Sequence, residues 1–262
     1  MKTSCNKETS TFVIRKYSSN KLQVKTFTMR KLLFSALAIA VVATSAFSQS
    51  EAKTEHENIV TREVPVSSFD QLKANGIFQL QLSQGDKESV RIEADESLQP
   101  LFEVRNEGDR LIISMKKVND KQLKGKGKMK VYLTFKNLKA MDLGVVGNIT
   151  STGTLHFTDL HLKNESVGNI SLQLTATNLT MNNSSVGNVA LSGEAEAATF
   201  RNSGVGSLEA AAFVVQNIDI ENDGVGNAEV NAAKKLSVQQ SFLGKVSNKG
   251  AATARSRKKV KV

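Results

Sequence analysis

Hydrophobic and polar residues alternate with a period of two through the second half of the chain. In every stretch of about twenty residues the alternation occurs twice, once directly after a glycine and once about ten residues later. Such alternation is typical of a β-strand that buries one face. We therefore predict two ladders of inward-facing side chains. The first contains Ile170/Leu172, Val189/Leu191, Leu208/Ala210 and Ala228/Val230, and the second contains Leu160/Leu162, Leu179/Met181, Ala198/Phe200, Ile218/Ile220 and Leu236/Val238.

Glycines set the period of this repeat. They are 21, 19, 19, 20 and 18 residues apart, and all but the last follow a valine: Gly147, Gly168, Gly187, Gly206, Gly226 and Gly244. Polar turns rich in Asn, Ser and Gly, such as 182–185, precede them, and these residues suit tight corners. A period near 20 with a recurrent glycine turn predicts an all-β, right-handed β-helix-like solenoid over residues 141–250, with coils about 4.8 Å apart. A meander or a propeller is the rival fold, but propeller blades need about 40 residues.

The preceding part of the chain, residues 59–140, has a different texture. It contains alternating runs such as 77–82, 90–94 and 131–135, with turns at 84–86 and 106–109. An open end of a solenoid exposes its core and unpaired strand edges. We expect this strand-rich part to extend or cap the same stack.

The N-terminal region has the pattern of an export signal. In residues 29–48 a short cationic start precedes an apolar run and small residues, which predicts a secretory signal peptide cleaved before Gln49. A transmembrane anchor is the alternative, although the apolar run is short for one. Residues 1–28 are then either untranslated or disordered, and residues 49–58 form a linker. The single cysteine, Cys5, lies before the signal, so the predicted mature chain has no thiol.

The net charge of +10 is unevenly distributed. Residues 1–48 hold eight basic residues and one acidic residue, and further basic clusters lie at 116–130 and in the tail 251–262. Neither cluster has interleaved aromatic residues for base stacking, so we expect no nucleic-acid partner. Solvated loops or contact with anionic glycans or lipid headgroups are the remaining interpretations.

Several motifs in order resemble a known family. They are Ser68-Phe69-Asp70-Gln71-Leu72, Asn75-Gly76-Ile77-Phe78-Gln79-Leu80, Gln84-Gly85-Asp86 and Leu111-Ile112-Ile113, followed by the valine-glycine repeats. Over residues 59–250 the chain resembles the head GIN domain family of auto-transporter adhesins, common in Bacteroidetes-type bacteria. The resemblance implies an exported β-helical protein and supplies no catalytic residues. The chain departs from the family's more usual Gly-x-Gly-Asp turns by having Val-Gly-Asn.

Residues that could carry chemistry are sparse. The three histidines, His56, His156 and His161, lack metal-ligand spacing, and we interpret the last two as solvent-facing strand residues. Asp219, Glu221, Asp223 and Glu229 are the best candidates for the carboxylate cluster of a polysaccharide lyase or hydrolase, but a solvated face explains them more simply. We expect no catalytic, cofactor or metal site. A further expectation is that Asn148, Asn169, Asn188 and Asn227 stack in a hydrogen-bonded ladder.

These patterns together predict an exported, non-enzymatic, adhesin-like or cell-envelope interaction module without a stable transmembrane anchor. A glycan or cell-surface polymer is the expected partner, contacted through many weak polar groups along the rod. Two alternatives remain: a polysaccharide-active enzyme and a self-assembling structural β-helix. The compartment is expected to be the periplasm, the outer-membrane surface or the exterior.

Overall fold

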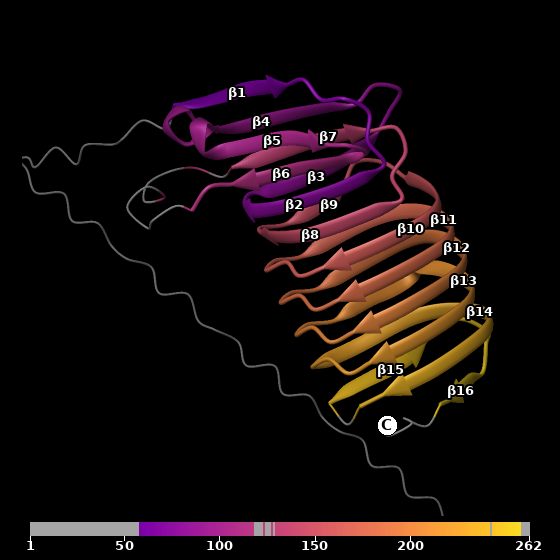
Figure 1. Cartoon of the computed structure of the whole chain (residues 1–262). Helices are drawn as coiled ribbons and strands as arrows, with labels where there is room; N and C mark the ends of the chain where they lie inside the picture. The colour runs from indigo at the N-terminus through magenta and orange to yellow at the C-terminus, as the bar shows by residue number, and fades with distance from the viewer. Residues whose placement is uncertain (1–57, 118–122, 124–126, 128, 242, 258–262) are drawn as a thin grey trace, which may run out of the picture. The chain divides into compact units, whose positions relative to one another are not determined.

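The computed structural model describes residues 58–117, 123, 127, 129–241 and 243–257, and the predicted signal peptide lies outside them. Sixteen strands in this part of the chain form one continuous sheet that winds into a stack of coils (Figure 1). Within these residues no helix has the length and apolar character needed to cross a membrane. The predicted all-β solenoid is confirmed, with about six coils spaced about 19 residues apart.

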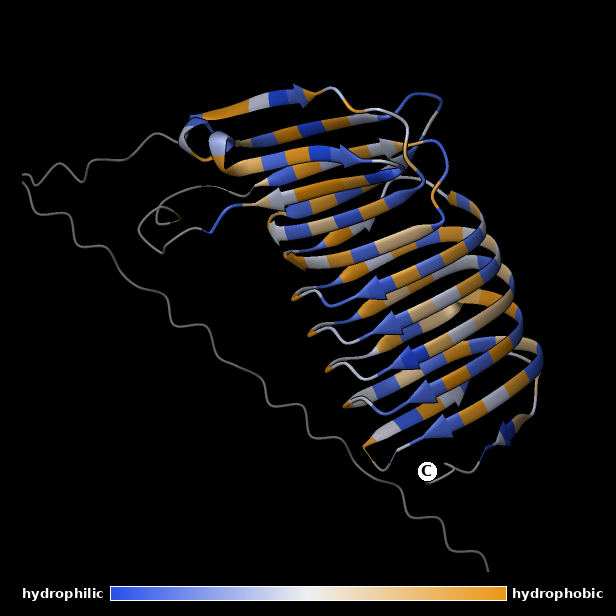
Figure 2. Ribbon diagram, viewed as in Figure 1, coloured by the Kyte–Doolittle hydropathy of each residue, from blue (hydrophilic) through white to orange (hydrophobic). Residues whose placement is uncertain are grey.

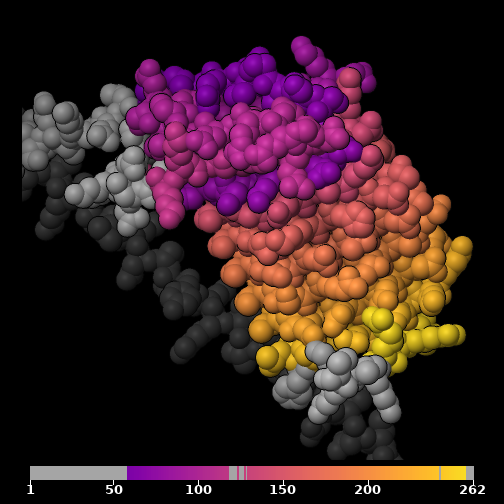
Figure 3. Space-filling model, viewed as in Figure 1, coloured from indigo at the N-terminus to yellow at the C-terminus, as the bar shows by residue number. Residues whose placement is uncertain are grey.

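The repeat region forms the regular part of the stack. Each long strand bends through about one coil and pairs in parallel with its neighbours, as in the register Ile170↔Val189 and Met181↔Phe200. Coils that are consecutive in sequence therefore lie next to one another, as the bands of colour in Figure 3 show. The strands are β8 (Ala140–Val146), β9 (Ile149–Ser151), β10 (Leu155–Asn164), β11 (Ile170–Asn183), β12 (Val189–Asn202), β13 (Leu208–Asn222) and β14 (Gly226–Gln240).

The N-terminal part extends this stack and then closes it. Parallel pairing joins β2 to β8 and β6, and β3 to β9 and β7. Antiparallel pairing then adds β1, β4 and β5 at the end, where a 3₁₀ helix carries the buried Leu98. The expectation that this part extends or caps the solenoid is confirmed. The elements are β1 (Ile59–Val64), β2 (Gln71–Ile77), β3 (Gln79–Gln84), β4 (Ser89–Asp95), η1 (Glu96–Leu101), β5 (Phe102–Glu107), β6 (Arg110–Met115) and β7 (Lys130–Phe135).

The opposite end of the stack is a short last coil. It consists of β15 (Gly244–Asn248) and β16 (Ala254–Ser256), and both pair in parallel with β14. The Asn248 side chain fixes the corner between them, because it accepts from the N–H of Ala232 at 2.8 Å and donates to the carbonyl oxygen of Ala252 at 2.8 Å.

A single apolar core runs through the whole stack. Every residue of the two predicted inward ladders is buried, and orange and blue positions alternate along the strands in Figure 2. The core continues without a break into the N-terminal part through residues such as Leu80, Leu133 and Leu143. The residues that form this core all lie within the described part of the chain.

At the valine-glycine corner the backbones of successive coils come into close contact. Gly187 has a φ of 136°, and a Cβ there would lie 2.2 Å from the carbonyl oxygen of Gly168. Only glycine fits this approach, which explains why the residue recurs once per coil. The preceding valines bridge to one another and stay about half exposed, as at Val186 with 52%.

Two asparagine ladders follow the stack. In the predicted one, the Asn148, Asn169 and Asn188 side chains each accept from the backbone N–H of the residue one coil further on, at 3.0–3.1 Å; the last of these donors belongs to Ser207, which interrupts the ladder before Asn227. A second ladder is buried: Asn164, Asn183 and Asn202 each donate from Nδ2 to the Oδ1 of the next asparagine at 2.6–2.7 Å, and Asn222 is the last acceptor. The sequence interpretation placed these four residues in polar turns, whereas they end strands and point inward.

Candidate functional site

The acidic residues considered for catalysis do not gather at one place. Asp219 and Glu221 lie in the second half of β13, whereas Glu229 lies in the first half of β14 beside Glu209. Asp219 pairs with Arg257, Glu221 accepts from Gln239 Nε2 at 2.7 Å, and Glu229 pairs with Lys249 at 3.3 Å. The solvated-face interpretation accounts for these positions.

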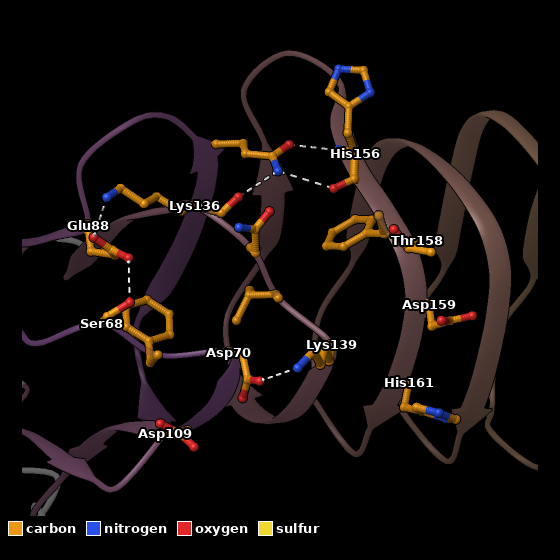
Figure 4. Close-up of a pocket in the computed structure, with 15 residues that line it drawn as sticks. Ser68, Asp70, Glu88, Asp109, Lys136, Lys139, His156, Thr158, Asp159 and His161 are labelled. Carbon is orange, nitrogen blue, oxygen red and sulfur yellow. Dashed lines mark hydrogen bonds and ion pairs between the residues drawn. The ribbon is translucent and has the colours of Figure 1, made fainter.

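A groove of about 900 Å³ lies where loops of the N-terminal part meet the first repeat coils (Figure 4). Its volume is within the usual range of ligand sites. Five segments line it: the β1–β2 connection, the β3–β4 loop, the β5–β6 turn, the β7–β8 loop and β10. The lining residues are Ser68, Phe69, Asp70, Gln84, Glu88, Asp109, Lys136, Asn137, Leu138, Lys139, His156, Phe157, Thr158, Asp159 and His161.

The groove contains an ion pair between Asp70 and Lys139 (Figure 4). The Lys139 Nζ atom donates to Asp70 Oδ2 at 2.8 Å. This hydrogen bond, with the negative charges of Asp70 and Asp109, raises the pKa of Lys139 above its ordinary value. Asp70 Oδ1 is buried and has no hydrogen-bond partner in the described part of the chain. A buried carboxylate oxygen has unused capacity to accept a hydrogen bond from a ligand.

A second carboxylate, Glu88, lies at one side of the groove in Figure 4. Glu88 accepts from Ser68 Oγ at 3.0 Å and lies 3.9 Å from Lys136 Nζ. Its side chain is only 11% exposed, whereas that of Lys136 is 50% exposed. The carboxylate is therefore held beneath a more exposed ammonium group, and both residues line the groove.

Gln84 connects two of the segments that line the groove. Its amide accepts from the N–H of His156 at 2.7 Å and donates to the carbonyl oxygens of His156 and Lys136, at 3.1 and 2.8 Å. This one side chain ties the β7–β8 loop to β10. The imidazole of His156 makes its own contact with Thr175 Oγ1 at 2.8 Å and stays exposed.

The two groove histidines are exposed strand residues, as the sequence interpretation predicted, and both line the groove. Asp159, between them, accepts from Asn178 Nδ2 at 2.7 Å. In the described segments no three His, Cys, Asp or Glu side chains come close enough together to hold a metal ion.

Chemically, the groove combines a buried apolar floor with walls of mixed hydrogen-bonding groups. Phe69, Leu138 and Phe157 are at most 9% exposed and form the floor. Carboxylates, ammonium groups, an amide and imidazoles surround them, so donors and acceptors stand side by side. This arrangement suits a ligand with several hydroxyl groups, each of which both donates and accepts.

Solved structures with a similar fold include proteins from Bacteroides fragilis and Parabacteroides distasonis. A "putative adhesin" from Bacteroides fragilis is 25% identical, with 76% of this chain and 97% of that chain covered and a TM-score of 0.64. A "putative lipid binding protein" from Parabacteroides distasonis is 18% identical, with 77% and 93% covered and a TM-score of 0.53. A "putative adhesin" from the same species is 17% identical, with 77% and 94% covered and the same TM-score. No curated protein matches the chain.

A family model described as "Putative auto-transporter adhesin, head GIN domain" matches residues 68–252. The match covers the groove, the repeat coils and most of the last coil, and it confirms the resemblance seen in the sequence. The chain belongs to the head GIN domain family.

Proposed function

We propose that this protein is an exported, non-catalytic, adhesin-like module that binds a glycan or another hydroxyl-rich cell-surface polymer in the groove. The observation that carries the proposal is the groove itself, where fixed carboxylates, amides and imidazoles surround an apolar floor. Family membership and the adhesin names of the structural relatives support it.

Several weak contacts suit such a role better than one strong contact. The groove is partly open, and β10, a strand of the repeat coils, forms one of its walls, so a bound polymer can also touch neighbouring coils. Many shallow polar contacts then act together, and binding rises steeply when several copies engage one surface. Asp70, whose side chain is 29% exposed, supplies the carboxylate that we expect a ligand hydroxyl to reach.

The test uses the chain from Gln49 onward on a glycan array, followed by titration of the best ligand. We expect saturable binding that Asp70→Asn weakens about tenfold or more, in keeping with the loss of a charged hydrogen bond. Glu165→Gln is a matched control, because Glu165 also bonds a lysine, Lys163, at 2.8 Å and raises the pKa of that lysine. It lies outside the groove and should leave affinity unchanged.

Two results would count against the proposal: absence of saturable binding to any polymer, or equal loss in both variants. Release of shortened products from a bound polymer, abolished by Asp219→Asn or Glu221→Gln, would favour the enzyme alternative instead. Concentration-dependent filaments without any ligand would favour the structural alternative.

A further inference from the structure

Charge is sharply divided along the repeat region. Residues 141–229 contain two basic and ten acidic residues, a net charge of −8. Residues 230–262 contain nine basic residues and no acidic residue, a net charge of +9. A solvated surface normally mixes both signs, so a block of one sign at one end of a rod calls for a partner of the opposite sign.

The fold gathers the basic block on the last two coils. Six of its residues are described and all are exposed; together they are named here the basic foot: Lys234, Lys235, Lys245, Lys249, Arg255 and Arg257. They belong to the second half of β14, to β15, to β16 and to the connections beside them, at the yellow end of the rod in Figure 1. The sequence then continues with Lys258, Lys259 and Lys261.

Most of the basic foot is not neutralised within the molecule. Lys249 pairs with Glu229 and Arg257 with Asp219. Lys234, Lys235, Lys245 and Arg255 form no ion pair with any described residue. Their charge is therefore available to a partner.

The end of the stack also limits what kind of partner can cover it. The N-terminal end is closed by antiparallel strands, whereas β15 and β16 pair only with β14 among the described strands. Exposed lysines on such an edge disfavour the addition of another strand. Two copies meeting through this end would bring like charges together, so a second solenoid does not fit there.

We propose that the basic foot docks the solenoid end-on onto a lipid bilayer that carries anionic headgroups. The six exposed side chains lie on the two coils nearest this end, within about two strand spacings of it, so long Lys and Arg side chains there can reach one anionic plane together. Leu243, 65% exposed at this end, adds an apolar contact at headgroup level. Each lysine or arginine near an anionic bilayer strengthens binding about fivefold.

The acidic coils give the docked rod a direction. A negative membrane repels residues 141–229, but only within a Debye length of about 8–10 Å, which is about two coils. Contact along the side of the rod is thus opposed while contact through its end is favoured. Five strand spacings separate β10 from the last coil, so the groove stands about 24 Å above the surface. This inference does not depend on what the groove binds.

The experiment measures co-sedimentation of the chain from Gln49 onward, which keeps the whole core, with lipid vesicles. We expect binding to phosphatidylcholine vesicles that contain phosphatidylglycerol, no binding to pure phosphatidylcholine, and loss of binding in about 1 M salt, where the Debye length is about 3 Å. The triple variant Lys234→Gln, Lys245→Gln and Arg255→Gln should bind about a hundredfold more weakly.

A charge-matched control separates the basic foot from net charge. The variant Lys73→Gln, Lys87→Gln and Lys117→Gln removes the same charge from exposed positions in the N-terminal part and should bind within about twofold of the parent. Circular dichroism checks the folding of both variants, and the basic-foot variant should keep its glycan affinity.

Equal weakening in both variants would overturn the proposal. So would absence of vesicle binding, including the case in which an anionic polysaccharide is bound instead. A salt-sensitive dimer in sedimentation velocity without lipid, lost in the basic-foot variant, would assign the basic foot to a second copy and also overturn it.

Discussion

Replacing Asn202 by alanine interrupts the buried asparagine ladder at an interior position. In the folded protein Asn183 Nδ2 donates to Asn202 Oδ1, and Asn202 Nδ2 donates to Asn222 Oδ1, each at 2.7 Å. The substitution leaves one donor and one acceptor buried without these partners, in neighbours that are at most 5% exposed. Each such group costs about 1–3 kcal/mol, so we expect the free energy of unfolding to fall by about 2–6 kcal/mol.

The end of the same ladder provides the comparison. Asn222 accepts from Asn202, but its own Nδ2 has no partner in the described part of the chain. Asn222→Ala therefore orphans one atom, Asn202 Nδ2, and also removes a donor that was already unsatisfied. We expect the free energy of unfolding to fall by about 1–3 kcal/mol, half or less of the fall at Asn202.

Urea unfolding followed by far-UV circular dichroism measures both costs. The comparison is valid if the free energy of unfolding depends equally steeply on urea concentration in the two variants and the parent, since repeat proteins can lose cooperativity. A loss at Asn222 as large as that at Asn202, or a loss below about 1 kcal/mol at Asn202, would refute the view that the ladder stabilises the stack through its satisfied pairs.

Two further predictions follow from other parts of the stack. Gly187→Ala should lower the free energy of unfolding by more than about 3 kcal/mol, because the new Cβ would lie 2.2 Å from a backbone oxygen. Gly153→Ala should cost only about 1 kcal/mol, because Gly153 has a φ of 72° but no atom within 4 Å of the new Cβ. Equal shifts of the melting temperature in the two variants would contradict this. Tyr132→Phe removes the hydrogen bond that, with Lys130 and against burial, lowers the pKa of Glu93. A lowered folded-state pKa stabilises the fold above the ordinary value of 4.5, and this stabilisation is lost as the pH falls below 4.5 through the lowered pKa. The loss of about 0.5–1.5 kcal/mol at pH 7 should therefore shrink as the pH falls below 4.5; a constant gap in urea midpoints would contradict this.

The inward ladders were predictable because the repeat presents the same alternation several times. The buried asparagines were predictable on the same grounds but were assigned to turns, since asparagine is common there. The correct signal is the spacing of two residues along the strand. Leu179, Met181 and Asn183 are two residues apart, so all three face the same side of β11. The ladder simply continues the apolar alternation by one further position.

The groove could not be predicted in the same way. Its walls come from segments as distant as residues 68–70 and 156–161, and only the parallel pairing of β2 with β8 and of β8 with β10 brings them together. None of these segments has a distinctive motif for binding. What the sequence did show was a change of texture near residue 140, and the groove lies at this change.

The regularity of the repeat explains why we place contacts with partners where the repeat is interrupted or ends. Within the regular coils each residue must pair and pack with the coils on both sides. The interior, the glycine corner and the asparagine ladders therefore vary little from coil to coil. Two places escape this constraint: the groove, where loops replace the bend of a continuous strand, and the last coil, which has a neighbour on one side only. Both carry side chains with charges or hydrogen-bonding capacity left for a partner. The regular coils between them fix the distance and direction from one to the other, which is what the two proposed contacts require of a stiff rod.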